Sequence, residues 1–297
     1  MTDLEDMRLF VEVAEQGGFS RAAATLGISK SIVSRRVAAM EEDLGAQLFR
    51  RTTRGMSPTE AGLEFKARAE RILADYAEAR EAVARESGQM VGRLRVSAPL
   101  SFGMRHVAPV LAAMAARHPG LEIDVSFSDR MVDLIGERYD AAVRIGSLRD
   151  SSLVARRVAS VRAHLVASPT YLERHGRPMT PADLARHECL IYSGSVSPEW
   201  SLRSGRRTIT IRPAGRLRSD NGDTLVQWAV MGLGITNSPS FLVSDELESG
   251  KLESVLEDFA TPEYGVYVVR PPGAEVPAKV RALSDEMADH FGRVGGL

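Results

Sequence analysis

Hydrophobic residues in the first part of the chain recur at spacings of three and four, which is typical of helices that bury one face. The first predicted helix spans residues 3–15, and its apolar face consists of Leu4, Met7, Phe10, Val11 and Ala14. Two shorter helices follow between Ser20 and Leu44. We expect Ser20 and Ser29 to cap them and Gly27 to end the first of the two. The apolar stripe of the second consists of Val33, Val37, Met40 and Leu44. Two helices joined by so tight a turn form a helix-turn-helix.

From residue 59 to about residue 86 the chain reads as one long helix that is rich in Ala, Glu and Arg. Its apolar positions form a narrow seam, made of Leu63, Ala69, Ile72, Leu73, Tyr76, Ala79 and Val83. A seam of this width is too thin to be covered by a globular core on several sides, so it indicates a partner helix. A stiff spacer that packs within its own chain is the alternative interpretation.

After a break at Ser87–Gln89 the pattern changes to strands that alternate with helices. In a first lobe, strands are predicted over 94–98, 121–127 and 141–145, and helices over 103–117 and 131–137. Two strands within 153–167 lead into a second lobe, with strands over 200–202, 208–211, 217–219 and 234–236, a helix that begins at Thr180, and a helix over 223–231. A strand over 264–269 and a helix over 278–291 return to the first lobe. This order predicts parallel α/β lobes that the chain crosses twice, as in a hinged binding domain.

The length and composition fit this division into parts. With 297 residues, 44% hydrophobic and 26% charged, the chain is long enough for two or three soluble domains with substantial cores. We predict a helix-turn-helix domain over 1–58, a linker helix and hinge over 59–89, and a two-lobed domain over 90–297. Its first lobe takes about 90–161 and 267–297, and its second lobe takes about 162–266.

A formal net charge of −1 argues at first against a nucleic-acid partner, but the charge is unevenly distributed. Between Lys30 and Arg54 six basic residues stand against three acidic ones. The free face of the second short helix carries Lys30, Ser31, Ser34 and Arg35 near its N-terminus. Such side chains donate to guanine or to phosphate, so this face suits the major groove of DNA.

A basic segment directly after this helix predicts a wing that lies against phosphates or in a minor groove. The predicted DNA contacts are Ser20, Ser29, Lys30, Ser31, Ser34, Arg35, Arg36, Arg50, Arg51, Thr52 and Arg54. A helix pair inside a bundle, with exposed basic residues that serve solubility, is the alternative.

The segment FVEVAEQGGFSRAAATLGISKSIVSRRVAAMEEDLGAQLFRRTTRGMSPTEAG, from Phe10 to Gly62, resembles the N-terminal domain of LysR-type transcriptional regulators. The segments LRVSAPLSFGMRHVAPVLAAMAARHPGLEID and SDRMVDLIGERYDAAVRIGSLRDSSLVARRV resemble the effector-binding domain of that family. The resemblance therefore covers nearly the whole chain. It implies an all-α winged helix-turn-helix with a long linker helix, followed by a two-lobed α/β domain like a periplasmic binding protein of type 2. It also implies a homodimer or homotetramer in which the long helices pair.

Two departures from the family pattern bear on specificity. Lys30 and Ser31 stand where relatives commonly carry Gln and often Pro, which affects the base preference but not the mode of docking. Asn237 and Ser238 stand where relatives usually carry an apolar pair, in the inner wall of the second lobe.

In parallel α/β lobes, ligands lie beyond the carboxyl ends of strands, where helix N-termini offer N–H groups. This rule selects the segments 97–102, 144–147, 193–195 and 221–224. The predicted effector contacts are Ser97, Pro99, Leu100, Ser101, Phe102, Arg144, Gly146, Ser193, Asn221 and Thr224. Hydroxyls, an amide and an Arg suit a small polar or anionic metabolite. The alternatives are structural, with Ser97 and Asn221 as helix caps, Arg144 paired with Asp140, and Phe102 in the core.

We find no reactive constellation. The six histidines are scattered, HEC at His187–Cys189 lacks the second His of a zinc motif, and GLG at Gly232–Gly234 follows a helix. We therefore expect no enzyme, no cofactor and no metal. The single cysteine, Cys189, excludes an intramolecular disulfide and reads as a small buried residue.

The N-terminal segment lacks the layout of a secretion signal, and no apolar run approaches the ~20 residues of a membrane span. We expect a cytoplasmic regulator with no membrane contact. Its partners are promoter or operator DNA, a small-molecule effector and, in an activator, RNA polymerase.

Overall fold

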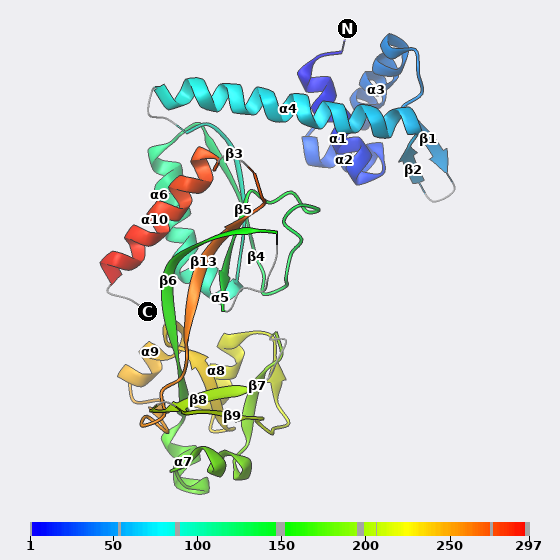
Figure 1. Ribbon diagram of the computed structural model, residues 1–297. Helices are drawn as coiled ribbons and strands as arrows, with labels where there is room; N and C mark the ends of the chain where they lie inside the picture. Colours follow the sequence, from blue (N-terminus) through cyan, green and yellow to red (C-terminus); the bar gives the residue numbers. More distant parts are fainter. Residues whose placement is uncertain are drawn as a thin grey trace. The chain divides into compact units, whose positions relative to one another are not determined.

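The computed structural model describes residues 2–52, 55–86, 90–146, 152–194, 199–205, 207–273 and 276–294. The chain divides into two compact units, Met1–Gln89 and Met90–Leu297. Figure 1 shows the first unit as a cluster of helices that includes one long helix, and the second as a pair of α/β lobes. None of the helices in the described ranges is long and apolar enough to cross a membrane.

The first unit has the predicted helix-turn-helix followed by a hairpin and the long helix. It contains α1 (Leu4–Gln16), α2 (Phe19–Leu26), α3 (Lys30–Leu44), β1 (Phe49–Thr52), β2 (Gly55–Pro58) and α4 (Glu60–Glu86). Asp3 caps α1 by accepting a hydrogen bond from the Asp6 backbone N–H at 2.8 Å. Gly27 ends α2 with a φ of 66°, and Ser29 caps α3. The sequence prediction of the helix-turn-helix and its hairpin is confirmed.

The core of the first unit forms around Phe10, which is fully buried. Its ring centroid lies 4.9 Å from that of Phe49 in the hairpin and 5.0 Å from that of Phe65 in α4. The members of the predicted α3 stripe that are buried here are Val33, Val37 and Met40. Leu44 is 42% exposed, so its prediction as a buried residue was wrong. It is the last residue of α3 and lies beyond the core.

Ser20 does not cap α2, contrary to the sequence prediction. The helix begins at Phe19, and Gly18 takes the cap position without a side-chain hydrogen bond. The helix thus starts two residues earlier than predicted, and the Phe19 ring packs on the core with its centroid 6.4 Å from that of Phe49. Ser20 is therefore an exposed residue of the first helical turn.

The apolar seam of α4 is covered at some positions and exposed at others. Ala69 is fully buried and Leu73 packs against the core of the first unit, on the same side as Phe65. Ile72 and Tyr76, one helical turn apart, are 44% and 41% exposed. The side chain of Val83 lies outside the described residues. The part of the seam with Ile72 and Tyr76 is thus available to a partner helix.

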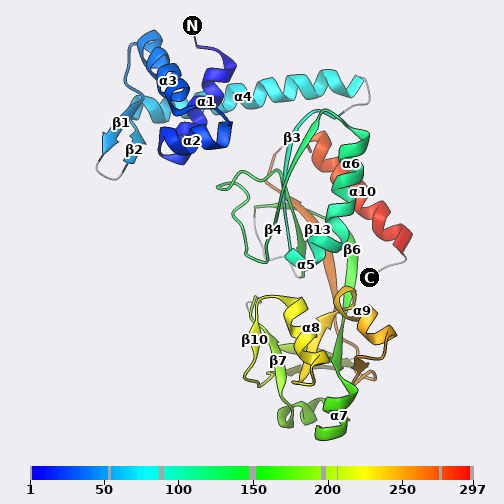
Figure 2. The ribbon, with the colours of Figure 1, turned by 180° about the vertical axis from the view of Figure 1, so that it is seen from behind.

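The first lobe is a sheet covered on one face by helices. It contains β3 (Gly92–Ala98), α5 (Leu100–Phe102), η1 (Gly103–Val107), α6 (Ala108–Arg117), β4 (Leu121–Phe127), β5 (Ala141–Ile145), β13 (Glu263–Arg270) and α10 (Ala278–Val294). Figure 2 shows α6 and α10 side by side, and their buried residues share one core with β3 and β5. That core includes Leu94, Val96, Leu111, Met114, Leu283 and Met287.

The second lobe has a smaller sheet with apolar clusters on both faces. It contains α7 (Pro169–His175), η2 (Pro181–Arg186), β7 (Cys189–Tyr192), β8 (Trp200–Ser204), β9 (Arg207–Ile211), β10 (Arg218–Ser219), α8 (Gly222–Val230), β11 (Ile235–Pro239), α9 (Ser240–Glu248) and β12 (Glu253–Ser254). The sequence analysis missed α7, β7, α9 and β12. The thiol of Cys189 is fully buried, and burial raises its pKa to about 11, so it stays protonated near neutral pH.

One long strand, β6 (Val154–Ala167), belongs to both lobes. The strand order of the sheet is β10-β7-β11-β6-β13-β5-β3-β4. Residues Val154–Arg162 of β6 pair with β13 in the first lobe, and Ala163–Ala167 pair with β11 and β12 in the second. Figure 1 shows β6 and β13 running together between the lobes. The prediction of two separate strands was wrong, because no Gly or Pro between 154 and 167 makes a turn.

As the sequence predicted, β3 pairs parallel with β4 and β5, and β7 pairs parallel with β10 and β11. The connection differs, since β6 pairs antiparallel with β13, β11 and β12, and β13 pairs antiparallel with β5. The predicted helix over 131–137 was wrong, since residues 134–138 form a turn. The Asp133 carboxylate accepts the Ile135 N–H at 3.1 Å and the Glu137 carboxylate accepts the Asp133 N–H at 3.2 Å. These side-chain hydrogen bonds add to a backbone turn in which the Glu137 N–H donates to Asp133 O at 2.8 Å.

Candidate nucleic-acid interface and interlobe site

The N-terminal half of α3 presents a polar face whose charges are unpaired. Lys30, Ser31 and Arg35 are exposed and Ser34 is half-buried. Among the residues that the structure describes, neither Lys30 nor Arg35 makes an ion pair or a side-chain hydrogen bond. Ser29 accepts the Ile32 N–H at 3.3 Å, and its hydroxyl lies 2.9 Å from that of Ser31. The start of α3 therefore offers hydroxyls and two free cations.

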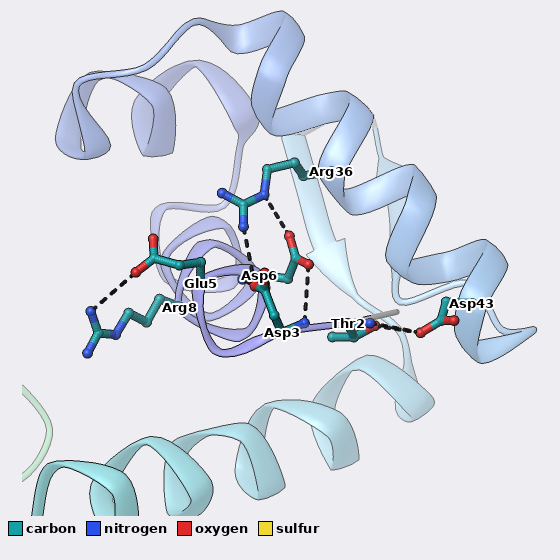
Figure 3. Close-up of polar contacts among 7 residues, drawn as sticks. All are labelled: Thr2, Asp3, Glu5, Asp6, Arg8, Arg36 and Asp43. Atoms are coloured by element: carbon teal, nitrogen blue, oxygen red, sulfur yellow. Dashed lines mark hydrogen bonds and ion pairs between the residues drawn. The ribbon is translucent and has the colours of Figure 1, made fainter. Parts of the chain in front are cut away.

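Arg36, the neighbour of Arg35, faces the other way and is occupied. Figure 3 shows its guanidinium reaching from α3 to the start of α1. Its Nε lies 2.6 Å from Asp6 Oδ1 and its Nη2 lies 3.5 Å from Asp3 Oδ1. The side chain of Asp6 is only 16% exposed, which shields this pair from water. Arg36 was predicted as a DNA contact, and in the structure its guanidinium joins α3 to the start of α1.

A second contact ties the far end of α3 to the N-terminal segment. The Asp43 carboxylate accepts hydrogen bonds from the Thr2 hydroxyl at 2.9 Å and from the Thr2 N–H at 3.0 Å, as Figure 3 shows. These hydrogen bonds lower the pKa of Asp43. The backbone N–H of Asp6 is the largest cause that lowers the pKa of Asp3 at the cap of α1. The contacts of Arg36 and Asp43 thus join α3 at two points to the N-terminal segment and the start of α1.

The hairpin is anchored so that its basic strand stands outside the core. Leu48 and Phe49 are buried, and the Glu41 carboxylate of α3 accepts their N–H groups at 2.7 Å and 3.1 Å. Arg50 is exposed, and its Nε donates to Ser57 Oγ across the strands at 3.4 Å. The side chains of Arg51 and Thr52 and the whole of Arg54 lie outside the described residues.

At the interlobe site, the helix that begins at Leu100 is held by carboxylates from two directions. The N–H of Leu100 donates to Asp129 Oδ1 at 3.0 Å. The Ser101 hydroxyl donates to Asp223 of the second lobe, and the Arg105 guanidinium lies 2.7 Å from the other oxygen of Asp223. We call the contact of Ser101 and Arg105 with Asp223 the interlobe clasp. The sequence analysis selected Ser101 and the segment around Asp223, but it missed Arg105 and Asp129.

The carboxylates near the clasp affect one another. Burial, together with the charges of Asp220 and Asp223, raises the pKa of Asp129, although the Leu100 N–H opposes this. Burial and the charges of Asp129 and Asp220 raise the pKa of Tyr192 to about 12. Burial also acts on Asp223, yet hydrogen bonds from Arg105 and Ser101 lower its pKa overall. Asp223 is therefore charged in the clasp at neutral pH.

Two of the predicted effector contacts, Ser97 and Arg144, have a buried polar atom without a partner among the described residues. Ser97 is fully buried in β3, and its hydroxyl makes no hydrogen bond. Arg144 in β5 donates from one nitrogen to its neighbour Val143 O at 3.3 Å, while its Nη2 is buried and unpaired. Burial lowers the pKa of Arg144. Asp140 instead accepts the Arg95 N–H at 2.7 Å and lies 3.4 Å from Lys279 Nζ. Ser97 and Arg144 thus keep unused donors.

Several other selected residues have structural roles. Asn221 caps α8, where its side-chain oxygen accepts the Thr224 N–H at 2.9 Å and the Thr224 hydroxyl at 3.1 Å. Phe102 is 1% exposed, and its ring centroid lies 5.2 Å from that of Phe241.

The remaining predicted effector contacts lie in loops at the ends of strands or helices. Pro99 precedes α5 in the cap position, Gly146 has a φ of 121° after β5, and Ser193 is exposed after β7. Ser147 and Ser195 lie outside the described residues.

Comparisons with known proteins agree over nearly the whole chain. The family model "Bacterial regulatory helix-turn-helix protein, lysR family" matches residues 4–63, and the model "LysR substrate binding domain" matches residues 87–292. The transcriptional regulator PtxR of Pseudomonas aeruginosa is 35% identical over 98% of this chain and 94% of its own length. The regulator DmlR of Escherichia coli is 35% identical over 97% of this chain and 95% of its own length.

Solved structures give the same result. The full-length virulence activator AphB of Vibrio cholerae has a TM-score of 0.62 and 30% identity, covering 97% of this chain and 99% of that one. The regulator CrgA of Neisseria meningitidis has a TM-score of 0.57 and 31% identity, covering 98% of both chains.

Proposed function

The chain belongs to the LysR family of DNA-binding transcriptional regulators, and on that premise we propose which of its residues contact DNA, a second subunit and an effector. Its helix-turn-helix domain binds DNA, and its two-lobed domain is an effector-binding domain. In our proposal the N-terminal half of α3 enters the major groove of a promoter or operator. Lys30, Ser31, Ser34 and Arg35 contact base edges there, and Ser20 and Ser29 contact the backbone.

The observation that carries this proposal is the contrast between two adjacent arginines. Arg35 is exposed with a free guanidinium, whereas Arg36 is bound to Asp6 at 2.6 Å. The test is gel retardation of duplexes that flank the gene of this protein, at moderate ionic strength. Retardation of a promoter fragment in preference to random duplex supports the proposal, and equal retardation of both contradicts it.

We assign the hairpin to the phosphate backbone. Arg50 is exposed on the outer side of β1, and Arg51, Thr52 and Arg54 extend the basic segment along the chain. Arg50→Ala should weaken binding to every duplex to the same degree and flatten the plot of log affinity against log salt by about one unit. Fluorescence anisotropy on operator and random duplexes over a salt series measures both effects. A loss confined to the operator would contradict the assignment to phosphate.

We propose that two subunits pair through the exposed face of α4, because a two-fold dimer reads a palindromic site. Tyr76→Glu, which buries a charge in the proposed seam, should weaken dimerisation by about tenfold or more. Sedimentation over a range of protein concentrations measures this change. Ala74→Glu is the matched control, since Ala74 is exposed on the opposite side of α4. Equal dissociation constants for the two variants would exclude this face. The choice between a homodimer and a homotetramer follows from the same runs.

For the effector we propose the space between the lobes, at the carboxyl ends of β3 and β5. The unused donors of Ser97 and Arg144 favour a ligand that carries a carboxylate or another acceptor. The other residues that we assign to the ligand are Pro99, Leu100, Gly146, Ser193, Asn221 and Thr224. Phe102 supports the helix from the core. The ligand acts by binding the two lobe arrangements unequally.

The interlobe clasp suggests how such a ligand is read out. Asp223 of the second lobe presents a carboxylate to Ser101, one of the residues assigned to the effector. An acidic effector competes with Asp223 for that hydroxyl, and it changes the lobe arrangement by releasing the clasp.

We further propose that the protein acts by binding alone, without catalysis. At promoters that it activates, we propose that it contacts RNA polymerase. Turnover assays on any ligand that raises the melting temperature test the first point.

A further inference from the structure

A strongly basic edge of the second lobe has no role in the sites described so far. From Arg203 to Arg218 the chain carries six arginines and no acidic residue. The stretch forms the end of β8, the whole of β9 and the segment that leads into β10. Arg206 lies outside the described residues, and the other arginines are Arg203, Arg207, Arg212, Arg216 and Arg218. All five are exposed. We call them the arginine edge.

These arginines are largely free of partners. Arg216 lies 3.7 Å from Glu188, and its side chain is 88% exposed. Among the described residues, the side chains of Arg203, Arg207, Arg212 and Arg218 make no ion pair or hydrogen bond. Such unneutralised charge destabilises the compact lobe slightly through mutual repulsion. A binding partner of opposite charge would relieve it.

The fold gathers the arginines on surfaces that are otherwise polar. In the ribbon of β8 and β9, Trp200, Leu202 and Ile211 pack inward on the core of the lobe. The outward positions are Ser201, Arg203, Thr208 and Thr210, which pair across the two strands. Arg207 has the parity of Ile209 and Ile211, and it is exposed where β9 begins, opposite Ser204. Along the segment into β10, the exposed residues are Arg212, Ala214, Arg216 and Arg218, and the residues between them are buried or half-buried. β10 is the last strand of the sheet, so this segment forms an open edge.

The chemistry of this surface selects one kind of partner. Arg, Ser and Thr are the side chains that contact phosphate oxygens in protein–DNA complexes. The outward positions of the ribbon contain no aromatic residue on which bases of single-stranded nucleic acid could stack. They also lack the buried apolar and aromatic anchors that dominate the energy of protein–protein interfaces. The exposed Arg, Ser and Thr side chains therefore fit a row of phosphates best.

We propose that the arginine edge binds the phosphate backbone of duplex DNA outside the sequence read by α3, as a second, sequence-independent contact. This contact goes beyond the proposed function, because it belongs to the effector-binding domain. It would link the position of the second lobe to the path of the DNA, so that a change in lobe arrangement alters the length of duplex that is held.

The test compares two triple variants of the full chain that carry the same change in net charge. In the first, Arg203, Arg207 and Arg212 are replaced by Gln. In the control, three exposed arginines elsewhere in the second unit, Arg157, Arg162 and Arg174, are replaced by Gln. Binding is measured over a salt series on a short operator duplex and on a duplex with long flanks on both sides. Melting temperatures of both variants establish that they are folded.

On the long duplex, the salt slope of the first variant should fall by about 0.9 for each phosphate contact that is lost. The control should keep the wild-type slope, and all three proteins should bind the short duplex alike. Equal slopes for both variants on the long duplex would overturn the proposal. The proposal would also be overturned if the first variant bound DNA normally but lost transcription with purified RNA polymerase. That result would make the arginine edge a protein-docking surface. Failure of the wild type on the short duplex would instead contradict the function assigned to α3.

Discussion

Arg35→Ala should weaken binding to the operator by about 1–3 kcal/mol, or roughly 5- to 150-fold, and should relax the preference for one base pair. The reason is the position of Arg35 on α3, exposed and with its guanidinium unpaired in the described chain, where it can donate to the edge of a guanine. Fluorescence anisotropy on the operator and on a set of single-base variants measures both the loss and its base dependence.

Arg36→Ala is the matched control for this experiment, because the two arginines are adjacent but face different partners. Removing Arg36 leaves the carboxylate of Asp6, 16% exposed, without its strongest partner. We expect this to lower the free energy of unfolding by about 1–2 kcal/mol and to weaken all duplexes equally, with the base preference kept. Thermal unfolding distinguishes the variants. If both arginines changed base preference to the same extent, the separation of a reading residue from a bracing residue would be wrong.

The second large effect concerns regulation in the absence of any added metabolite. Asp223→Asn keeps an acceptor for the Ser101 hydroxyl but removes the charge that binds Arg105, whose guanidinium lies 2.7 Å away. The side chains of Arg105 and Asp223 are 42% and 41% exposed, so solvent screens the pair and we expect a loss of about 1 kcal/mol. This is enough to shift the balance of lobe arrangements by about fivefold. Basal transcription should move toward the level that an effector induces.

The measurement combines small-angle scattering of the full chain with transcription in vitro. Asp245→Asn is the matched control, since Asp245 is exposed on α9 in the same lobe and takes no part in the clasp. Unchanged scattering and unchanged basal transcription in Asp223→Asn would mean that the clasp does not hold the lobes.

The pH dependence of the clasp follows from the sign of the pKa shift. Hydrogen bonds from Arg105 and Ser101 outweigh burial and lower the pKa of Asp223 below its ordinary value of 3.8. Because the pKa is lowered, the clasp contributes its full stabilisation of the lobe arrangement at pH values above 3.8. That stabilisation is lost as the pH falls through the lowered pKa of Asp223. The effect of Asp223→Asn should therefore be the same at pH 6 and pH 8.

Local signals in the sequence determined the helix-turn-helix, its caps at Gly27 and Ser29, the long helix after Thr59, and the alternation of strands and helices in the lobes. These features depend on contacts between residues a few positions apart, through helical periodicity, capping groups and turn residues. The dense match of Phe10–Gly62 to a known family added the expected function.

Only the tertiary structure decided which polar residues are free to act. Arg35 and Arg36 were both predicted from the sequence as DNA contacts, and they differ because α1 brings Asp6 to one of them and not to the other. In the same way, the clasp joins Ser101 to Asp223, residues more than a hundred positions apart in the chain. Likewise, β6 is one continuous strand because its two halves pair with strands of different lobes, and those pairings are not evident from the sequence. A side chain is available to a ligand only if no distant neighbour has bound it, and the packing of the whole chain determines which neighbours come close.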